Sequence, residues 1–336
     1  MKKIFVIYTG GTIGMQPTSS GYAPAENLMA LLQEKIPPQV MAQLPAFELF
    51  EYPELIDSSN IQPYNWQQIA QDIIDRYEQY DGFIVLHGTD TMAYSCSMLS
   101  FMLQNLHKPV IFTGSQIPLC EARTDGVENF TGALCMAANS RIHEVCLYFN
   151  NCLLRGNRTT KVNCEQFDAF NTPNYPQLGQ ADIQIQLNSP FLWQSEASEQ
   201  FTSACNSAPL VLPLFLFPGI SADWIRTALS QPYKAFILKT YGTGNGPDLD
   251  KALLAELSDA SSRKKIIINQ TQCLRGAVVP SAYAAGSALE QAGLMSGYDT
   301  TLEACFCKLH FLFSCGLSVH EIKEKMTQNL CGEMTL

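Results

Sequence analysis

Two short stretches of this sequence combine hydroxyl side chains with glycine, and each follows an apolar run of strand length. The first, at residues 9–14, reads TGGTIG, and the second, at residues 87–91, reads HGTDT. Threonine is a poor nucleophile until a base takes its proton, so Thr12 or Thr89 needs a partner. Lys161 is a candidate, because burial disfavours the charged form of a lysine while a carboxylate such as Asp90 stabilises it. Two threonines, a lysine and an aspartate are together consistent with acyl transfer.

The backbone of both stretches can also contribute to such a reaction. N–H groups of the glycine-rich loop and of the turn at Thr89 could form an oxyanion hole, where one donor is worth about 3 to 4 kcal/mol. A proton relay through Lys161 would typically contribute about 10² to 10⁴ in rate. The residues also leave structural roles open, because Asp90 or Thr91 could cap the following helix without taking part in a reaction. Lys161 could equally be a surface lysine on a hairpin.

Alternating strands and helices must position these groups. Apolar runs predict strands at residues 3–8, 46–52, 83–86, 109–113 and 145–149, and apolar periodicity predicts helices at 25–35, from Pro63 onward, at 92–106 and at 125–139. This alternation indicates a mostly parallel sheet covered by helices on both faces. Since parallel strands end at one edge, the polar residues that follow them should share a crevice. These residues are Thr12, Ser58, Thr89, Asp90 and Ser115.

The stretch from residue 16 to 21 is polar and is expected to be a loop. Tyr22 lies beside it, just before the first expected helix. Long loops in compact domains often act as lids over active sites. Tyr22 could belong to such a lid, or it could be an aromatic side chain that holds the loop to the surface.

The composition of the sequence changes between residues 163 and 208, where Pro, Ser and Asn are frequent and the periodicity of apolar residues is weak. This change indicates a domain junction. We expect an N-terminal catalytic domain at residues 1–189, a linker at 190–209 and a smaller C-terminal α/β domain at 210–336. The second domain should contain strands at 210–217, 235–238 and 265–268, with helices between them and at 299–328.

Composition excludes several classes of function. The 336 residues are 46% hydrophobic and 15% charged, as in globular proteins, and the net charge of -10 disfavours nucleic acids and anionic membranes as partners. Twelve cysteines without metal-type spacing and five dispersed histidines predict no metal site. The order GGxxG, followed by a loop, does not match a dinucleotide fingerprint, so no cofactor is expected. The opening apolar run is too short for a signal peptide, which favours a cytoplasmic protein.

The two stretches, read with their flanks at residues 8–15 and 86–94, resemble the two signatures of bacterial L-asparaginases. Residues 57–60, 113–118, 156–161 and 269–273 extend the resemblance over nearly the whole chain. The expected lack of a signal peptide and the sequence TMAY at residues 91–94 resemble the cytoplasmic type I branch rather than the periplasmic type II branch. The resemblance implies hydrolysis of L-asparagine to L-aspartate and ammonia through an acyl-enzyme.

The resemblance also implies residue roles. Thr12 would be the nucleophile, assisted by Tyr22, while Thr89, Asp90 and Lys161 would form a second triad that activates water. The substrate would be bound by residues from four of the strand-end turns, with Asp90 facing its ammonium, Ser58 its carboxylate and the backbone at Ser115 its side-chain amide. The full binding set comprises Gly11, Asp57, Ser58, Ser59, Thr89, Asp90 and Ser115.

Similarity further implies a homotetramer built as a dimer of dimers, and type I relatives can bind asparagine at a second, activating site. Thr271 and Cys273 stand where that site would be. Lys239 occupies a position where regulated relatives carry arginine, and lysine lacks the bidentate fork that grips a carboxylate. Cys273 could instead be an ordinary buried thiol.

Three other functions remain open at this stage. A subunit of a tRNA-dependent amidotransferase would need an RNA-facing domain or a basic surface. Glutamine could be the main substrate, since one methylene discriminates by only about 1 to 3 kcal/mol. A non-catalytic amino-acid sensor could retain the fold without the chemistry.

Overall fold

The computed structural model describes residues 2–19, 21–24, 27–195, 197–279 and 284–335. The chain divides into two compact units, Met1–Ser203 and Ala204–Leu336. The division after Ser203 falls within the segment that the sequence suggests as a linker, whereas the boundaries at 189 and 210 stay predictions.

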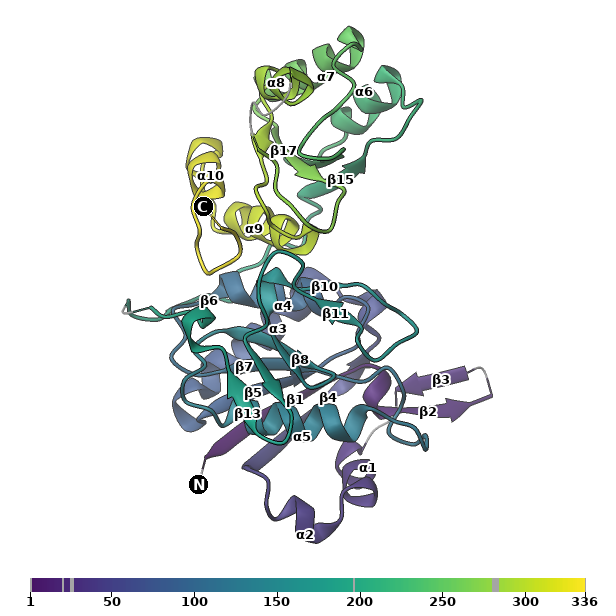
Figure 1. Ribbon diagram of the computed structural model, residues 1–336, viewed down its shortest axis with the longest axis vertical. Helices are drawn as coiled ribbons and strands as arrows, with labels where there is room; N and C mark the ends of the chain where they lie inside the picture. Colours follow the sequence, from purple (N-terminus) through teal and green to yellow (C-terminus); the bar gives the residue numbers. More distant parts are fainter. Residues whose placement is uncertain (1, 20, 25–26, 196, 280–283, 336) are drawn as a thin grey trace. The chain divides into compact units, whose positions relative to one another are not determined.

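The N-terminal unit is built on an eight-stranded sheet in the order β13-β12-β9-β8-β7-β5-β1-β4 (Figure 1). The five strands β8 (Val145–Phe149), β7 (Val110–Thr113), β5 (Gly82–Leu86), β1 (Lys3–Gly10) and β4 (Ala46–Ile56) run parallel. Three short strands extend the sheet antiparallel at one edge, β9 (Cys152–Arg155), β12 (Gly179–Ala181) and β13 (Ile185–Leu187). The prediction of a mostly parallel sheet is confirmed.

Helices cover both faces of this sheet because its central strands are apolar on both sides. Ile4, Val6 and Tyr8 of β1 pack in one core with α1 (Leu28–Lys35) and α5 (Gly126–Ala137). On the opposite side lie α3 (Pro63–Arg76) and α4 (Met92–Met102), which contact one another. A short helix, α2 (Pro38–Met41), follows α1.

Two local predictions are wrong. The helix expected at residues 92–106 ends at Met102, because Leu103–Gln104 form β6 and pair antiparallel with β14 (Gln200–Phe201). The expected loop at 16–21 instead contains a hairpin of β2 (Met15–Thr18) and β3 (Gly21–Pro24), which projects from the body of the unit (Figure 1). Strand pairing decides both structures: β6 pairs with a strand far along the chain, whereas β2 pairs with the next strand, β3, across a short turn. The expected helix at 25–35 begins at Leu28, and residues 25 and 26 lie outside the described residues.

The C-terminal unit repeats the α/β plan on a smaller scale, as predicted. Its parallel sheet has the order β15 (Val211–Phe215), β16 (Ala235–Thr240), β17 (Ile266–Thr271) and β18 (Met295–Ser296). Apolar side chains of α6 (Ala222–Ser230), α7 (Lys251–Ser262) and α8 (Ala284–Gln291) pack in one core with Phe236, Leu238 and Ile267. The helices α9 (Leu302–Ser314) and α10 (Val319–Met326) complete the unit. In the part of the chain that the structure describes, every helix is too short or too polar to cross a bilayer.

Three strand-end loops of the N-terminal unit touch one another through glycine. Gly11, after β1, has φ 87°, and a Cβ added to it would lie 2.5 Å from the Cα of Gly88, after β5. A Cβ added to Gly88 would in turn lie 2.7 Å from the Cβ of Ser58, after β4. The loops that carry Thr12, Thr89 and Ser58 are therefore in direct contact, at a spacing that no side chain on these glycines would permit.

The contact predicts that Gly88→Ala destabilises the N-terminal unit. The new methyl group overlaps Ser58, and overpacking of this kind costs about 1 to 3 kcal/mol. Urea unfolding should show the loss. Gly286→Ala is the matched control, because the nearest atoms to its added Cβ lie at 3.7 Å, an ordinary contact. Equal stability of both variants and wild type would contradict the close approach of the loops.

Candidate active site

Thr12 opens a short 3-10 helix, η1 (Thr12–Gly14), directly after β1. Its side chain is half-buried, and its hydroxyl makes no hydrogen bond within the described residues. Gly11 precedes it with a positive φ that bulkier residues rarely adopt. The hydroxyl is thus placed at the strand end without being used by the fold, as a nucleophile requires.

Lys161 joins the second threonine to its neighbouring carboxylate. Its Nζ lies 2.8 Å from Thr89 Oγ1 and 2.8 Å from Asp90 Oδ1. Thr89 is 6% exposed, the Lys161 side chain 20% and the Asp90 side chain 63%. The ammonium therefore lies between a buried hydroxyl and a carboxylate that faces solvent. The alternative of a surface lysine on a hairpin holds for the hairpin, but the side chain is bonded to Thr89 and Asp90 and is mostly buried.

A small hairpin positions Lys161. It lies in β10 (Thr160–Lys161), opposite Phe170 of β11 (Phe170–Asn171). The Phe170 ring packs against Phe149, at the end of β8, with ring centroids 5.3 Å apart in an edge-to-face arrangement. This aromatic contact fixes the hairpin to the sheet edge, and it thereby brings Lys161 to Thr89 across 72 residues of sequence.

A buried histidine orients the peptide that precedes Thr89. His87 Nδ1 lies 2.7 Å from Gly88 O, a group that only accepts, so Nδ1 must carry the proton. His87 Nε2 then accepts from Ser95 Oγ at 2.9 Å, and Ser95 Oγ accepts from the Trp66 indole N–H at 2.9 Å. Burial lowers the pKa of His87 to about 4, which agrees with a neutral ring. Because the Gly88 carbonyl points to His87, the Thr89 N–H points the other way.

The turn after β4 is tied to the same site. Asp57 caps the 3-10 helix η2 (Ser58–Asn60) by accepting from Ser59 N at 3.0 Å, while Ser58 is buried. Thr91 Oγ1 donates to Ser58 O at 2.7 Å, which links this turn to the Asp90 turn. Among the predicted binding residues, Ser58 therefore borders the loop of Thr89, and Asp57 holds the turn together.

The turn after β7 contributes Ser115 and a residue that the sequence did not single out, Gln116. Ser115 is 1% exposed, and its hydroxyl has no partner within the described chain. Gln116 Oε1 accepts from Thr89 Oγ1 at 3.2 Å. The buried carboxylate of Asp125 holds this turn through the backbone N–H groups of Gln116 and Ile117. Gln116 lies in the stretch 113–118 that extends the family resemblance, but the sequence assigns no role to Gln116 or Asp125, and only their contacts do.

Tyr22 lies on the projecting β2–β3 hairpin and is half exposed. Its hydroxyl donates to Glu121, and this bond is the main cause of a raised pKa for Tyr22. The structure pairs Tyr22 with Glu121, and no hydrogen bond to Thr12 occurs among the described residues. An assisting role for Tyr22 stays a prediction.

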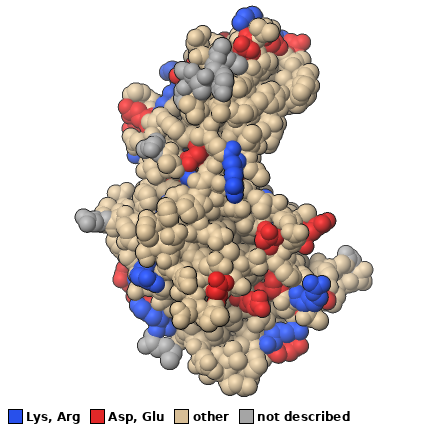
Figure 2. All heavy atoms as spheres, viewed as in Figure 1, with Lys and Arg blue, Asp and Glu red and all other residues tan. Residues whose placement is uncertain are grey.

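Charged groups elsewhere are dispersed. On the face in Figure 2, Lys and Arg side chains are scattered and interspersed with Asp and Glu, without a continuous basic surface. Within the described ranges, no group of three or more His, Cys, Asp or Glu side chains is arranged to hold a metal ion.

The residues suggested for a regulatory site lie in the C-terminal unit, and they do not all converge. Lys239 pairs with Gln270 and Thr240 with Thr271 on adjacent strands, so Lys239 and Thr271 project from opposite faces. Lys239 is buried, which lowers its pKa, and its Nζ lies 3.3 Å from Gln270 Oε1. Thr271 Oγ1 accepts from Cys273 N at 3.0 Å, and Cys273 is exposed. The alternative of a buried thiol at Cys273 is wrong.

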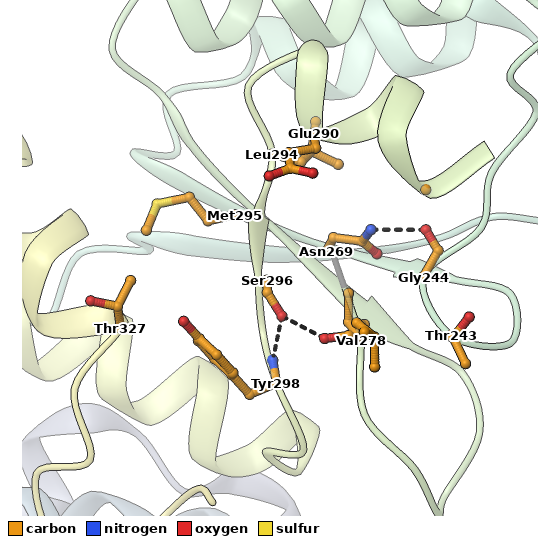
Figure 3. A pocket seen from close by; sticks show the side chains of 12 residues that line it. Thr243, Gly244, Asn269, Val278, Glu290, Leu294, Met295, Ser296, Tyr298 and Thr327 are labelled. Atoms are coloured by element: carbon orange, nitrogen blue, oxygen red, sulfur yellow. Dashed lines mark hydrogen bonds between the residues drawn. The ribbon is translucent and has the colours of Figure 1, made fainter. Parts of the chain in front are cut away.

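A pocket of about 260 Å³ occurs in the same unit (Figure 3). Asn269 Nδ2 donates to Gly244 O on one side, and Ser296 Oγ donates to Val278 O and accepts from Tyr298 N on the other. Within the described residues its lining includes none of the three suggested regulatory positions.

Both units of the chain are similar to known proteins. A family model for the N-terminal domain of asparaginase matches residues 3–192, and a model for the glutaminase/asparaginase C-terminal domain matches residues 211–326. L-asparaginase 1 of Escherichia coli strain K12 is 49% identical over 335 residues, which cover 99% of this chain and 98% of that protein. The mouse 60 kDa lysophospholipase is 41% identical over 100% of this chain, but the match covers 63% of that protein.

Among solved structures, L-asparaginase I from Vibrio cholerae superimposes with a TM-score of 0.91 at 46% identity, covering 100% of this chain and 99% of that one. Fold, family models and relatives define the class of protein as an amidohydrolase enzyme. The chain belongs to the asparaginase family.

The buried histidine predicts a specific pH dependence of stability. Between pH 4 and about 6.5 the unfolded chain binds a proton at His87 that the folded chain excludes, so stability falls as pH falls through this window. The loss on going from pH 7 to pH 5 should be about 2 kcal/mol smaller in His87→Gln than in wild type. Urea unfolding at both pH values measures it. His107 is exposed, so His107→Gln is the control. An equal change in the free energy of unfolding between pH 7 and pH 5 in all three proteins would disprove burial of a neutral ring.

Proposed function

We propose that this chain hydrolyses L-asparagine to L-aspartate and ammonia through an acyl-enzyme on Thr12. The observation that carries the proposal is Lys161 Nζ at 2.8 Å from both Thr89 Oγ1 and Asp90 Oδ1, beside the loop of Thr12. Membership of the asparaginase family supports the substrate class.

The reaction proceeds in two halves. Thr12 Oγ attacks the side-chain amide carbon, the C–N bond breaks, and the amide nitrogen leaves as ammonia with the Thr12 proton. Lys161 first releases its ammonium proton to solvent, and it regains a proton from solvent after the turnover. A water molecule then attacks the acyl carbon and gives a proton to Thr89 Oγ1, while the proton that Thr89 already carried passes to the neutral amine of Lys161. Lys161 finally returns the proton to Thr12 as the acyl bond breaks. Backbone N–H groups at Thr12 and Thr89 face the developing oxyanion.

Substrate recognition follows from the charges at the sheet edge. Asp90 Oδ1 is occupied by Lys161, and its exposed side chain offers Oδ2 to a substrate ammonium in a charge-assisted bond. Ser58, held by the Asp57 cap beside Ser59, would receive the α-carboxylate. The backbone at Ser115 would read the side-chain amide, and Gly11 would border the same group.

The remaining functional attributes belong to this proposal. Tyr22 assists Thr12 after its bond to Glu121 opens. The protein works in the cytoplasm as a homotetramer, a dimer of dimers, with catalytic residues in the N-terminal domain. Scattered basic groups on the visible face do not favour a tRNA-bound subunit (Figure 2).

Ammonia release on addition of asparagine tests the proposed reaction. Thr12→Ala should reduce kcat by more than about 10³-fold, because the nucleophile is lost. Thr89→Val and Lys161→Met should each reduce kcat by about 10² to 10⁴-fold with the fold intact. Thr227→Ala, on the exposed side of α6, is the control and should match wild type. A sensor would release no ammonia, and a Thr12→Ala variant with near wild-type activity would exclude Thr12 as nucleophile.

We also propose a second asparagine site at Thr271 and Cys273, distinct from the Lys239 face. Its test is a pair of saturation curves, one with asparagine and one with glutamine. A sigmoidal asparagine curve that becomes hyperbolic in Thr271→Ala is expected, because the variant lacks the hydroxyl that fixes the Cys273 turn. A hyperbolic curve in wild type would make Thr271 and Cys273 structural residues only.

A further inference from the structure

Gln116 is bonded to both sides of the proposed relay. Its Oε1 accepts from Thr89 Oγ1 at 3.2 Å, and its Nε2 donates to Gln166 O at 3.2 Å. Gln166 lies in the turn that joins β10 to β11, and the same hairpin carries Lys161. Because Lys161 also donates to Thr89 Oγ1, the three residues and the hairpin form a closed ring of contacts.

The protons within this ring have fixed directions. An ammonium has donors only, so Thr89 Oγ1 must accept from Lys161 and has one proton left to donate. The carbonyl of Gln166 accepts only, so the Gln116 amide must turn its NH₂ group to Gln166 and its oxygen to Thr89. The Thr89 proton is therefore directed to Gln116 while Lys161 is charged.

The two bonds to Thr89 differ in quality. The Lys161 bond, at 2.8 Å, has the length of a charge-assisted bond, whereas the bond to Gln116, at 3.2 Å, is long for a hydroxyl donor. Thr89 therefore accepts a strong hydrogen bond from Lys161 and donates a weak one to Gln116. A weakly held proton can be redirected when a substrate or water enters.

The Gln116 backbone is itself fixed. Its N–H donates to both oxygens of Asp125, at 3.0 Å each, and Asn129 Nδ2 donates to Asp125 Oδ2 at 3.0 Å. Asp125 and Asn129 are buried. The side-chain amide is therefore presented to Thr89 from a turn with little freedom.

We propose that Gln116 is a positioning residue for the Thr89–Lys161 pair. It accepts the Thr89 proton in the resting site and ties the Lys161 hairpin to Thr89 through Gln166. No proton moves to Gln116, whose amide acts only as an acceptor and donor of hydrogen bonds. The inference rests on the proposed function, because it assigns this residue a role in that reaction.

Gln116→Met tests the inference, since methionine keeps the length and removes both hydrogen bonds. With asparagine, kcat should fall about 3- to 10-fold, the effect of losing the hydrogen bond to Thr89, while KM stays within about two-fold. The thermal midpoint should remain that of wild type. Gln43→Met is the matched control, because among the described residues the exposed side chain of Gln43 bonds only the Gln39 carbonyl. Unchanged kcat in Gln116→Met, or a loss confined to KM, would overturn the inference.

A second measurement separates this inference from the proposed function. Acetylation of Lys161 by acetic anhydride, followed by mass spectrometry, reports how tightly the hairpin holds the amine and requires no catalysis. Gln116→Met should raise the labelling rate about three-fold or more over wild type and Gln43→Met. Equal rates in all three proteins would overturn the positioning role. An inactive wild type with increased labelling in Gln116→Met would instead contradict the proposed reaction alone.

Discussion

The site depends on the close contact of three strand-end loops at two glycines. Gly11 lies against the backbone of Gly88, and Gly88 lies against the side chain of Ser58, so the loops after β1, β5 and β4 touch one another. This contact places the turns that carry Thr12 and Thr89 side by side. Larger residues at Gly11 or Gly88 would separate the loops, and the groups that they carry would no longer reach one substrate.

Around this contact, polar groups from separate elements fix one another. His87 holds the Gly88 peptide, Thr91 holds the Ser58 turn, and Asp125 holds the turn after β7. Each is a buried or partly buried group with a specific partner, as expected where an unsatisfied polar group would be costly. The result is a set of fixed dipoles around a threonine hydroxyl that has no partner of its own among the described residues. Such preorganisation is the usual source of electrostatic stabilisation in enzymes.

Much of the fold was predictable, because parallel strands buried on both faces require continuous apolar runs. Residues 145–149 match β8 without error, and the expected strands and helices occur in the expected order. The hairpin β2–β3, the short strand β6 and the antiparallel strands β9, β12 and β13 were not predicted. The predictions failed where antiparallel strand pairing decides the structure. Leu103 leaves the helix to pair with Phe201, and residues 15–18 form a strand only because residues 21–24 face them. Gln116 lies in the stretch 113–118 that carries part of the resemblance, but its role was missed because the sequence does not distinguish a glutamine that bonds Thr89 from one that faces water.

The sequence by itself determined the class of fold, the glycine-rich turns and the types of residue available for chemistry, because these depend on local patterns of apolarity and backbone freedom. The tertiary structure alone decided which of those residues meet. Lys161 reaches Thr89 because the Phe170–Phe149 contact fixes its hairpin, and Lys239 and Thr271 separate because adjacent strands place them on opposite faces. Distances between residues far apart in the chain are set by packing, and a short stretch of sequence does not show which distant residues it packs against.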